Sequence, residues 1–151
     1  MKAIGIKMVE LTAMTAEEAI LKGYFVNGKS GDDQGYVVTY YDGYKSWCPK
    51  EVADAAYFVL DEKNDGTKIL KEDVDKFLTN YVSYTIGPET TIVLATTVTN
   101  FDFVDSSACV DAKNYSQELG EQYALENIKN NLWSYLDFVL QWAKNGIKNN
   151  K

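Results

Sequence analysis

The chain has 151 residues, a formal net charge of -7 and 46% hydrophobic residues, enough to bury the core of one domain or of two small modules. It contains no histidine, and all 15 basic residues are lysines. Histidine is the commonest general base and metal ligand near neutral pH, and arginine is the commonest reader of guanine edges. The composition therefore argues against histidine-based triads, metal centres and specific DNA recognition. The acidic balance argues against nucleic-acid and anionic membrane surfaces.

Eleven tyrosines, six phenylalanines and three tryptophans supply flat amphipathic surfaces, which favour binding over catalysis. We therefore expect a protein that is not an enzyme and needs no cofactor. No apolar run approaches the roughly 18 residues of a membrane-spanning helix, and the N-terminus has no signal-peptide pattern, so we expect a cytoplasmic protein. Cys48 and Cys109 are interpreted as two small apolar residues in a reducing compartment.

Three elements are predicted before the first glycine-rich segment ends. Residues 2–11 alternate apolar and other residues, which predicts a strand. Thr15 and Glu18 have the spacing of a capping box, so a short helix should follow and end near Gly23. The segment 27–35 (NGKSGDDQG) is polar and rich in glycine and predicts a loop.

A hairpin and a helix are predicted next. Residues 35–41 and 44–47 are β-prone runs on either side of Asp42-Gly43, which is typical of a tight hairpin. Pro49 is expected at the first helical position with Cys48 as N-cap, which predicts a helix over residues 49–56.

The second half begins after a charged stretch that we interpret as a linker, residues 61–70. A helix over 71–78 and a strand over 81–86 should follow, and then a second hairpin formed by 90–98 and 101–104. We therefore expect an N-terminal hairpin and helix module over 1–60 and a second module over 71–151.

The last third predicts one long helix that stops at Asn145-Gly146. Its expected apolar stripe comprises Leu119, Tyr123, Leu125, Ile128, Leu132, Trp133, Leu136, Val139, Leu140 and Ala143. The fold class is therefore α+β, with two small antiparallel β-meander units, helices and a long C-terminal helix. Because this stripe is longer than a small sheet can cover, with Trp133, Phe138 and Trp142 spread around the helix, we expect a homo-oligomer.

Three possible reactive sites carry little weight. Residues 61–72 have the spacing of a calcium loop, but Lys63 places a cation where a ligand oxygen should coordinate. The segment 106–109 (SSAC) contains possible nucleophiles without a histidine to activate them. Carboxylate pairs such as Asp102 and Asp105 show no spacing that favours a glycosidase over exposed strand residues.

The block around the first hairpin is the strongest candidate for a binding site. It places aromatic rings and two lysines near a helix N-terminus, where a phosphate is attracted and a base can stack. The candidate ligand-binding residues are Tyr40, Tyr44, Lys45, Trp47 and Lys50. The alternative is that the aromatic residues form cross-strand pairs and core.

The string from Thr90 to Leu140 resembles a family of small phage proteins named after a gene product of phage N-four and gene sixty-six of phage Sf-six. The resemblance rests on a strand hairpin, the turn Ser107 to Val110, the pair Asn114-Tyr115 and a helix with Leu132-Trp133. Ser134 stands where this family usually has a proline, which implies a less broken final helix.

The N-terminal block, with GYVVTYYDGYKSWCPKEVADAAY, is similar to a leader module found on many phage proteins. In some of them this module precedes a sponge domain that captures nucleotide signals made by bacterial TIR-type (Thoeris) immunity. The resemblance implies a phage accessory protein in the host cytoplasm that sequesters an ADP-ribose-type signal without turnover. Two alternatives are an inhibitor that binds a host protein and a hydrolase that uses carboxylates.

Overall fold

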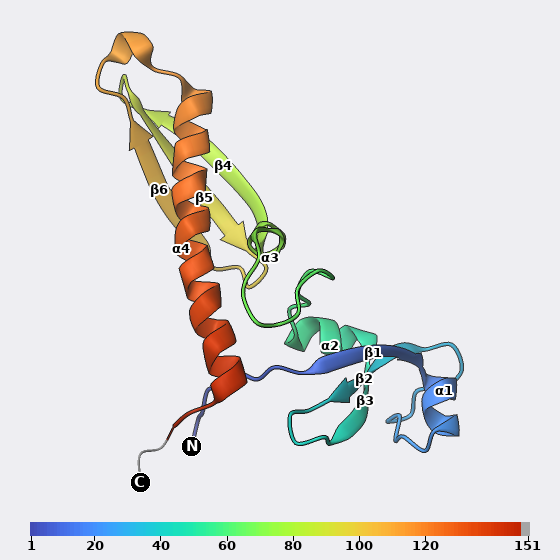
Figure 1. The fold of residues 1–151 in the computed structure, drawn as a ribbon. Helices are drawn as coiled ribbons and strands as arrows, with labels where there is room; N and C mark the ends of the chain where they lie inside the picture. The colour runs from blue at the N-terminus through green and yellow to red at the C-terminus, as the bar shows by residue number, and fades with distance from the viewer. Residues whose placement is uncertain (149–151) are drawn as a thin grey trace. The chain divides into compact units, whose positions relative to one another are not determined.

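The computed structural model describes residues 1–148 and has an α+β fold with two three-stranded antiparallel sheets (Figure 1). The predicted fold class, with two antiparallel units and a long C-terminal helix, is confirmed. The chain divides into two compact units. Unit 1 comprises residues 1–59 and the end of the chain from Gln141, and unit 2 comprises residues 60–140.

Unit 1 contains a meander of three strands, in the order β1-β2-β3, and two short helices. Its elements are β1 (Glu10–Thr15), α1 (Ala16–Leu21), β2 (Gln34–Thr39), β3 (Lys45–Pro49) and α2 (Lys50–Ala56). The strand predicted over 2–11 is wrong in position, because β1 begins at Glu10. Strand pairing explains the shift: β2 extends only far enough to pair with residues from Glu10 to Thr15.

Helix α1 begins where the sequence predicts. The Glu18 N–H donates to Thr15 Oγ1 over 3.3 Å, and the Glu18 carboxylate accepts from the Thr15 N–H over 2.9 Å. These two bonds form the predicted capping box. Gly23 follows the helix with φ of 82°, a left-handed conformation that glycine adopts readily, so the predicted stop is also confirmed.

The first hairpin also forms as predicted. The Tyr40 N–H donates to the Tyr44 carbonyl over 2.9 Å, and Asp42 Oδ1 accepts from the Tyr44 N–H over 3.0 Å. The predicted cap of α2 is wrong, since Pro49 is the N-cap and no side chain caps this helix. The first helical residue is Lys50, one position later than predicted, so the N-cap moves from Cys48 to Pro49.

The core of unit 1 forms around Trp47, which is only 6% exposed. Its ring packs with Ala16, Ala19, Val26 and Val37. Gly35 lies directly beneath it, because a Cβ at this position would lie 2.3 Å from the ring. A glycine is therefore required for the tryptophan to lie across strand β2.

Unit 2 contains the second meander, in the order β4-β5-β6. Its elements are α3 (Lys71–Phe77), β4 (Leu78–Ile86), β5 (Thr90–Thr97), β6 (Asp102–Ala108), the 3-10 turn η1 (Ala112–Asn114) and α4 (Gln117–Asn145). The predicted hairpin is confirmed, although β6 extends four residues past its predicted end at Val104. Helix α4 runs without a break through Ser134, as the absence of proline implies.

Helix α4 covers one face of this sheet. The residues of β5 alternate in burial, with Thr91, Val93, Ala95 and Thr97 buried. The buried residues of α4 recur at every fourth position: Gly120, Ala124, Ile128, Leu132, Leu136 and Leu140. Three members of the predicted stripe are exposed instead: Leu119, Tyr123 and Val139. Small residues at 120 and 124 bring the helix close to the sheet, so the flanking large side chains point outward.

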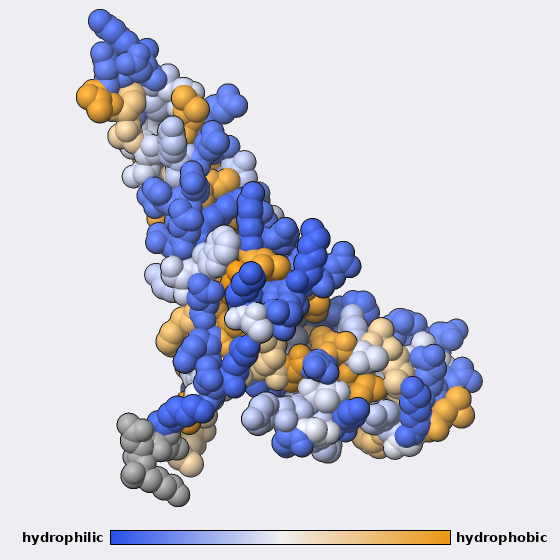
Figure 2. Space-filling view, viewed as in Figure 1, coloured by the Kyte–Doolittle hydropathy of each residue, from blue (hydrophilic) through white to orange (hydrophobic). Residues whose placement is uncertain are grey.

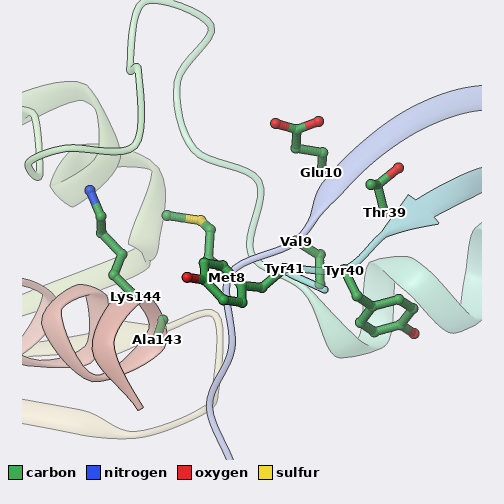
Figure 3. A pocket seen from close by; sticks show the side chains of 8 residues that line it. All are labelled: Met8, Val9, Glu10, Thr39, Tyr40, Tyr41, Ala143 and Lys144. Carbon is green, nitrogen blue, oxygen red and sulfur yellow. The ribbon is translucent and has the colours of Figure 1, made fainter. Parts of the chain in front are cut away.

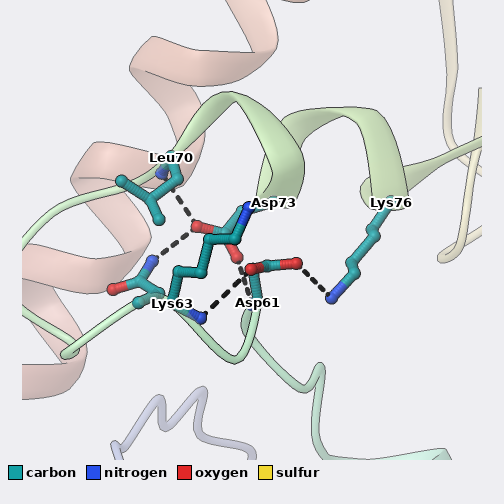
Figure 4. A network of polar contacts seen from close by, with 6 residues as sticks. Asp61, Lys63, Leu70, Asp73 and Lys76 are labelled. Carbon is teal, nitrogen blue, oxygen red and sulfur yellow. Dashed lines mark hydrogen bonds and ion pairs between the residues drawn. The ribbon is translucent and has the colours of Figure 1, made fainter.

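The loop over residues 61–70 is organised by one buried carboxylate, Asp73 (Figure 4). Asp73 accepts hydrogen bonds from the Asp61 N–H at 2.6 Å, the Leu70 N–H at 2.8 Å and the Asn64 side-chain amide. Lys76 forms an ion pair with Asp61 at 2.9 Å. Within residues 1–148, no group of three acidic or cysteine side chains is placed to hold a metal ion.

Apolar side chains remain on the surface of both units (Figure 2). Examples are Leu21 and Phe25 in unit 1 and Val104 and Val110 in unit 2. No helix in the described part of the chain is long and apolar enough to cross a membrane.

Candidate functional site

The five predicted ligand-binding residues do not form one cluster. Tyr40 and Tyr44 are together at the hairpin turn, with ring centroids 5.8 Å apart and an interplanar angle of 33°. Tyr40 is half-buried, and Tyr44 is 63% exposed. The two rings therefore form a tilted pair in which the Tyr44 ring is open to solvent.

Trp47 belongs to the core. Its ring is enclosed by the apolar residues of unit 1, and its Nε1–H donates to the Met14 carbonyl over 2.9 Å. A buried ring with a satisfied N–H presents no face for stacking a ligand. The core interpretation is therefore favoured for Trp47.

The two lysines lie in different surroundings. Lys45 is exposed at the start of β3, opposite Thr39. Lys50 begins α2, where its ammonium group pairs with the Asp54 carboxylate and lies 5.9 Å from the centre of the Tyr36 ring. The hydrogen bond to Asp54 raises the pKa of Lys50. Lys45 is thus the more available of the two for an anionic ligand.

A cavity of about 360 Å³ lies in unit 1 next to Tyr40 (Figure 3). Its walls come from residues 8–10, from Thr39 to Tyr41, and from Ala143 and Lys144 at the end of α4. The Met8 N–H donates to the Ala143 carbonyl over 3.3 Å, which ties two of these segments together. Tyr41 is fully accessible at the rim, with 99% of its surface exposed. The cavity therefore combines an apolar floor with aromatic and basic side chains.

A row of side chains crosses the sheet at the cavity. Register places Thr39 opposite both Glu10 and Lys45, so the three residues share one face of the sheet. Glu10 and Thr39 line the cavity, and Lys45 is the next residue in the row. One acidic, one hydroxyl and one basic group are thus available side by side.

A second group of side chains surrounds Tyr40. The Lys7 ammonium group lies 4.5 Å from the centre of the Tyr40 ring, which is a cation–π distance. Burial, and then the hydrogen bond with Tyr40, raises the pKa of Tyr57 to about 12. Tyr57 therefore remains a neutral phenol near pH 7 and can donate a hydrogen bond.

Lys7, Tyr41, Tyr57 and Lys144 were not predicted as site residues. Lys7 lies in the segment that the sequence predicts as a strand, and Lys144 is far away in the chain. Tyr57 follows the α2 helix directly, as its C-cap. Its sequence signal is that it is the aromatic residue that ends the hairpin and helix motif GYVVTYYDGYKSWCPKEVADAAY. Only the fold places it against Tyr40.

The Cys48 thiol is not activated as a nucleophile. Burial, and then the charge of Glu51, raises the pKa of the Cys48 thiol. The Cys109 thiol donates to the Asp111 carbonyl over 3.1 Å, and both cysteines are unoxidised thiols. A thiol is a poor nucleophile compared with its thiolate.

A second cavity, of about 470 Å³, lies in unit 2 between β6 and α4. Its lining is mainly apolar and includes Phe77, Phe101, Phe103 and Tyr135, with ring centroids 5.3 to 5.7 Å apart between successive members of the last three. No lysine lines it, and Asp102 does. It is therefore less suited to a phosphate-bearing ligand than the cavity in unit 1.

Residues 69–143 match the phage protein (N4 Gp49/phage Sf6 gene 66) family. The segment is similar to phage proteins. The match begins just before α3, includes the whole second sheet and ends near the end of α4.

The phage resemblance of the second half is thus supported. No curated protein and no solved structure matches the chain. The resemblance of the N-terminal block to a phage leader module stays a prediction, because the matched residues begin after it.

Proposed function

We propose that the protein is a phage accessory protein that binds and sequesters a nucleotide-derived signal of the ADP-ribose type in the host cytoplasm. The observation that carries this proposal is the cavity of unit 1, which is lined by Tyr40, the exposed Tyr41 and Lys144 and has Lys7 against the Tyr40 ring. The family match to residues 69–143 supports a phage origin.

The side chains that line the cavity, together with Tyr44 beside Tyr40 and Lys45 beside Thr39, suit the three parts of such a ligand. Tyr41 or Tyr44 offers a ring on which an adenine base stacks. Lys45 and Lys144 supply positive charge for the diphosphate. Glu10 is an acceptor for ribose hydroxyl groups, a role that acidic side chains perform in dinucleotide sites.

Binding without turnover agrees with the chemistry of the site. Turnover needs a general acid or base with a suitable pKa, and the chain has no histidine. Tyr57 and Cys48 remain protonated near pH 7, since the pKa of each is raised by burial. A protein that binds tightly and releases slowly withdraws a signal without any chemical step.

The direct test is calorimetry with ADP-ribose as the probe. Tyr41→Ala should weaken binding about 5- to 150-fold, because stacking on an aromatic ring contributes about 1–3 kcal/mol. Tyr123→Ala is the matched control, since Tyr123 is an exposed tyrosine of α4 outside the cavity. Equal losses in both variants, or no binding by the parent protein, would contradict the proposal.

The two predicted lysines provide a second comparison. Lys45→Glu should weaken binding more at low salt than at high salt, because lysine contacts are screened point charges. Lys50→Glu tests whether the helix start contributes as well, although its ammonium group already pairs with Asp54. Unchanged affinity in both variants would remove the lysines from the site.

Ligand identity can be tested without choosing a probe. The purified protein is incubated with lysate from bacteria with activated TIR immunity and then denatured, and the released small molecules are identified by mass spectrometry. Recovery of one nucleotide per chain supports sequestration. Loss of the nucleotide with appearance of a product would favour the hydrolase, and capture of a specific host polypeptide by a chain that releases no nucleotide would favour the protein inhibitor.

A further inference from the structure

Strand β4 is an unusual edge strand. It forms one side of the β4-β5-β6 sheet, and its nine residues, LTNYVSYTI, contain no charge and no proline (Figure 1). Natural edge strands are commonly protected by lysine, proline or short length, because an open edge pairs with other chains. The opposite edge strand, β6, carries two aspartates. Only the β4 edge therefore lacks such protection in this sheet.

The side chains of β4 are exposed on both faces of the sheet. Tyr81, Val82, Tyr84 and Ile86 are each between 38% and 59% exposed. In β5, by contrast, every residue is buried or half-buried. A run of tyrosine and β-branched residues with no charge has the composition of a strand that pairs.

Two features limit the part of β4 that can pair with a further strand. The register shifts between Leu78 and Asn80, so a bulge at Thr79 interrupts the start of the strand. The turn at Gly87 and Pro88 ends it, and Gly87 has φ of 65°. The regular segment is therefore 80–86, and its central residue is Ser83.

We propose that β4 pairs antiparallel with β4 of a second copy, about a two-fold axis through Ser83, to give a continuous six-stranded sheet. This register places Val82 of each copy opposite Tyr84 of the other, and Tyr81 opposite Thr85. Opposed residues share a face of the sheet, as antiparallel pairing requires. An aromatic residue beside a β-branched one is a favourable cross-strand pair, and here it occurs twice.

The symmetry and charge of the strand favour a second copy as the occupant. Copies of a chain with a net charge of -7 repel one another. Strand β4 carries no charged residue, so pairing along it places no like charges opposite each other within the strand. A different polypeptide of opposite charge would find no charged side chain on β4 to recognise. Closed two-fold pairing also uses up the open edge, which an endless array would not.

One charged residue lies near the proposed axis. The Ser83 hydroxyl donates to the Glu121 carboxylate of α4. Pairing brings the two Glu121 side chains towards each other on the helix-covered face. Glu121→Gln should therefore tighten the dimer, and a weaker dimer in this variant would contradict an axis at Ser83.

A matched pair of variants tests which edge is used. Val82 and Val104 both lie opposite Leu94, on the same face of the sheet, one on each edge strand. In sedimentation of the full chain at micromolar concentrations, Val82→Lys should be monomeric, and Val104→Lys should remain dimeric like the parent. Dissociation of both would instead indicate stacking of the open sheet faces. A monomeric parent, or dimers in all three proteins, would also overturn the proposal.

Disulfide trapping tests the register even if the lysine variant folds poorly. The background carries Cys48→Ser and Cys109→Ser. Ser83→Cys places two Cα atoms about 4.5–5.5 Å apart across the axis, within reach of a disulfide. Asn80→Cys is the control, because the two Asn80 positions are offset by six residues, about 20 Å. Oxidation should give a covalent dimer of the Ser83 variant only; equal dimer in both, or in neither, overturns the register.

Discussion

Replacement of Asp73 tests how the loop before α3 is held. The carboxylate is fully buried and accepts from two backbone N–H groups and one side-chain amide. Hydrogen bonds to a charged group contribute about 1.5–3 kcal/mol each, and unpaired buried donors cost more, while removal of a buried charge offsets part of the loss. We expect Asp73→Ala to lower the free energy of unfolding of unit 2 by about 3 kcal/mol.

Asp73→Asn gives a finer comparison at constant shape. Oδ1 accepts from the Asp61 N–H, whereas Oδ2 accepts from Leu70 and Asn64. An asparagine can retain one of these oxygens, but its NH₂ group must then face a donor. We expect a loss of about 2 kcal/mol, since at least one buried N–H becomes unsatisfied.

The assay is hydrogen exchange followed by mass spectrometry, because it reports on the segment itself. A loss of about 3 kcal/mol corresponds to faster exchange by roughly 100-fold at the amides of the 61–70 loop. Glu72→Gln is the control, since Glu72 is exposed on the same helix and should change stability by less than about 1 kcal/mol. If Asp73→Ala exchanged no faster than this control, the carboxylate would not hold the loop.

Three further changes follow from the geometry. Gly120→Ala should destabilise unit 2 by about 1–3 kcal/mol, because the added Cβ would lie 2.4 Å from Thr91 Oγ1. Trp47→Ala should destabilise unit 1 by about 3–5 kcal/mol as a core cavity forms. The Lys76 ammonium lowers the pKa of Asp61, so the stability difference between the parent and Asp61→Asn should be full above about pH 4 and vanish as the pH falls through the lowered pKa of the folded state.

Control measurements distinguish the proposed cause of each effect from a general destabilisation of the fold. For Gly120→Ala, the additional change Thr91→Ala should restore part of the stability, measured by urea unfolding in a double-mutant cycle. If the Gly120→Ala variant were as stable as the parent, helix α4 would be able to move away from the sheet to make room for the added Cβ. For Trp47→Ala, a normal melting temperature with lost ADP-ribose binding would favour the ligand interpretation. For Asp61, a pH-independent difference in melting temperature would exclude the ion pair as its cause.

Local signals in the sequence predicted local structure well. The capping box at Thr15 and the hairpin at Asp42-Gly43 depend on bonds between residues close in sequence, and both form. The strand predicted over 2–11 failed because a strand also needs a partner. An alternating pattern describes only the segment that carries it, whereas the length of β2 decides which residues of that segment can pair.

The long helix shows a different limit. A hydrophobic pattern gives weight to large side chains, so it selected Leu119 and Tyr123, which are exposed. It omitted Gly120 and Ala124, which are buried against β5 because they are small. Close approach of a helix to a sheet is a property of the pair of surfaces, and a single sequence carries only a weak signal for it.

The sequence predicted only part of the candidate site, because the site also depends on how distant segments pack together. Tyr40 lies at the unit 1 cavity and pairs with Tyr44, as adjacent aromatic residues on a hairpin can. Trp47 has the same composition signal and lies in the core. Lys7 and Lys144 come from the two ends of the chain, so only the fold brings them near the tyrosines.

The buried side of α4 grows in size along the helix, from Gly120 and Ala124 through Ile128 to three leucines. A uniform row of leucines at every fourth position could slide along a sheet by four residues, about 6 Å, and find an almost equivalent packing. Here a shift by four residues in one direction drives Ala124 into the space that fits only glycine, and a shift in the other places Ala124 where Ile128 was and leaves a hollow there. The increase in side-chain size along the buried side of α4 therefore specifies a single axial position of the helix on its sheet.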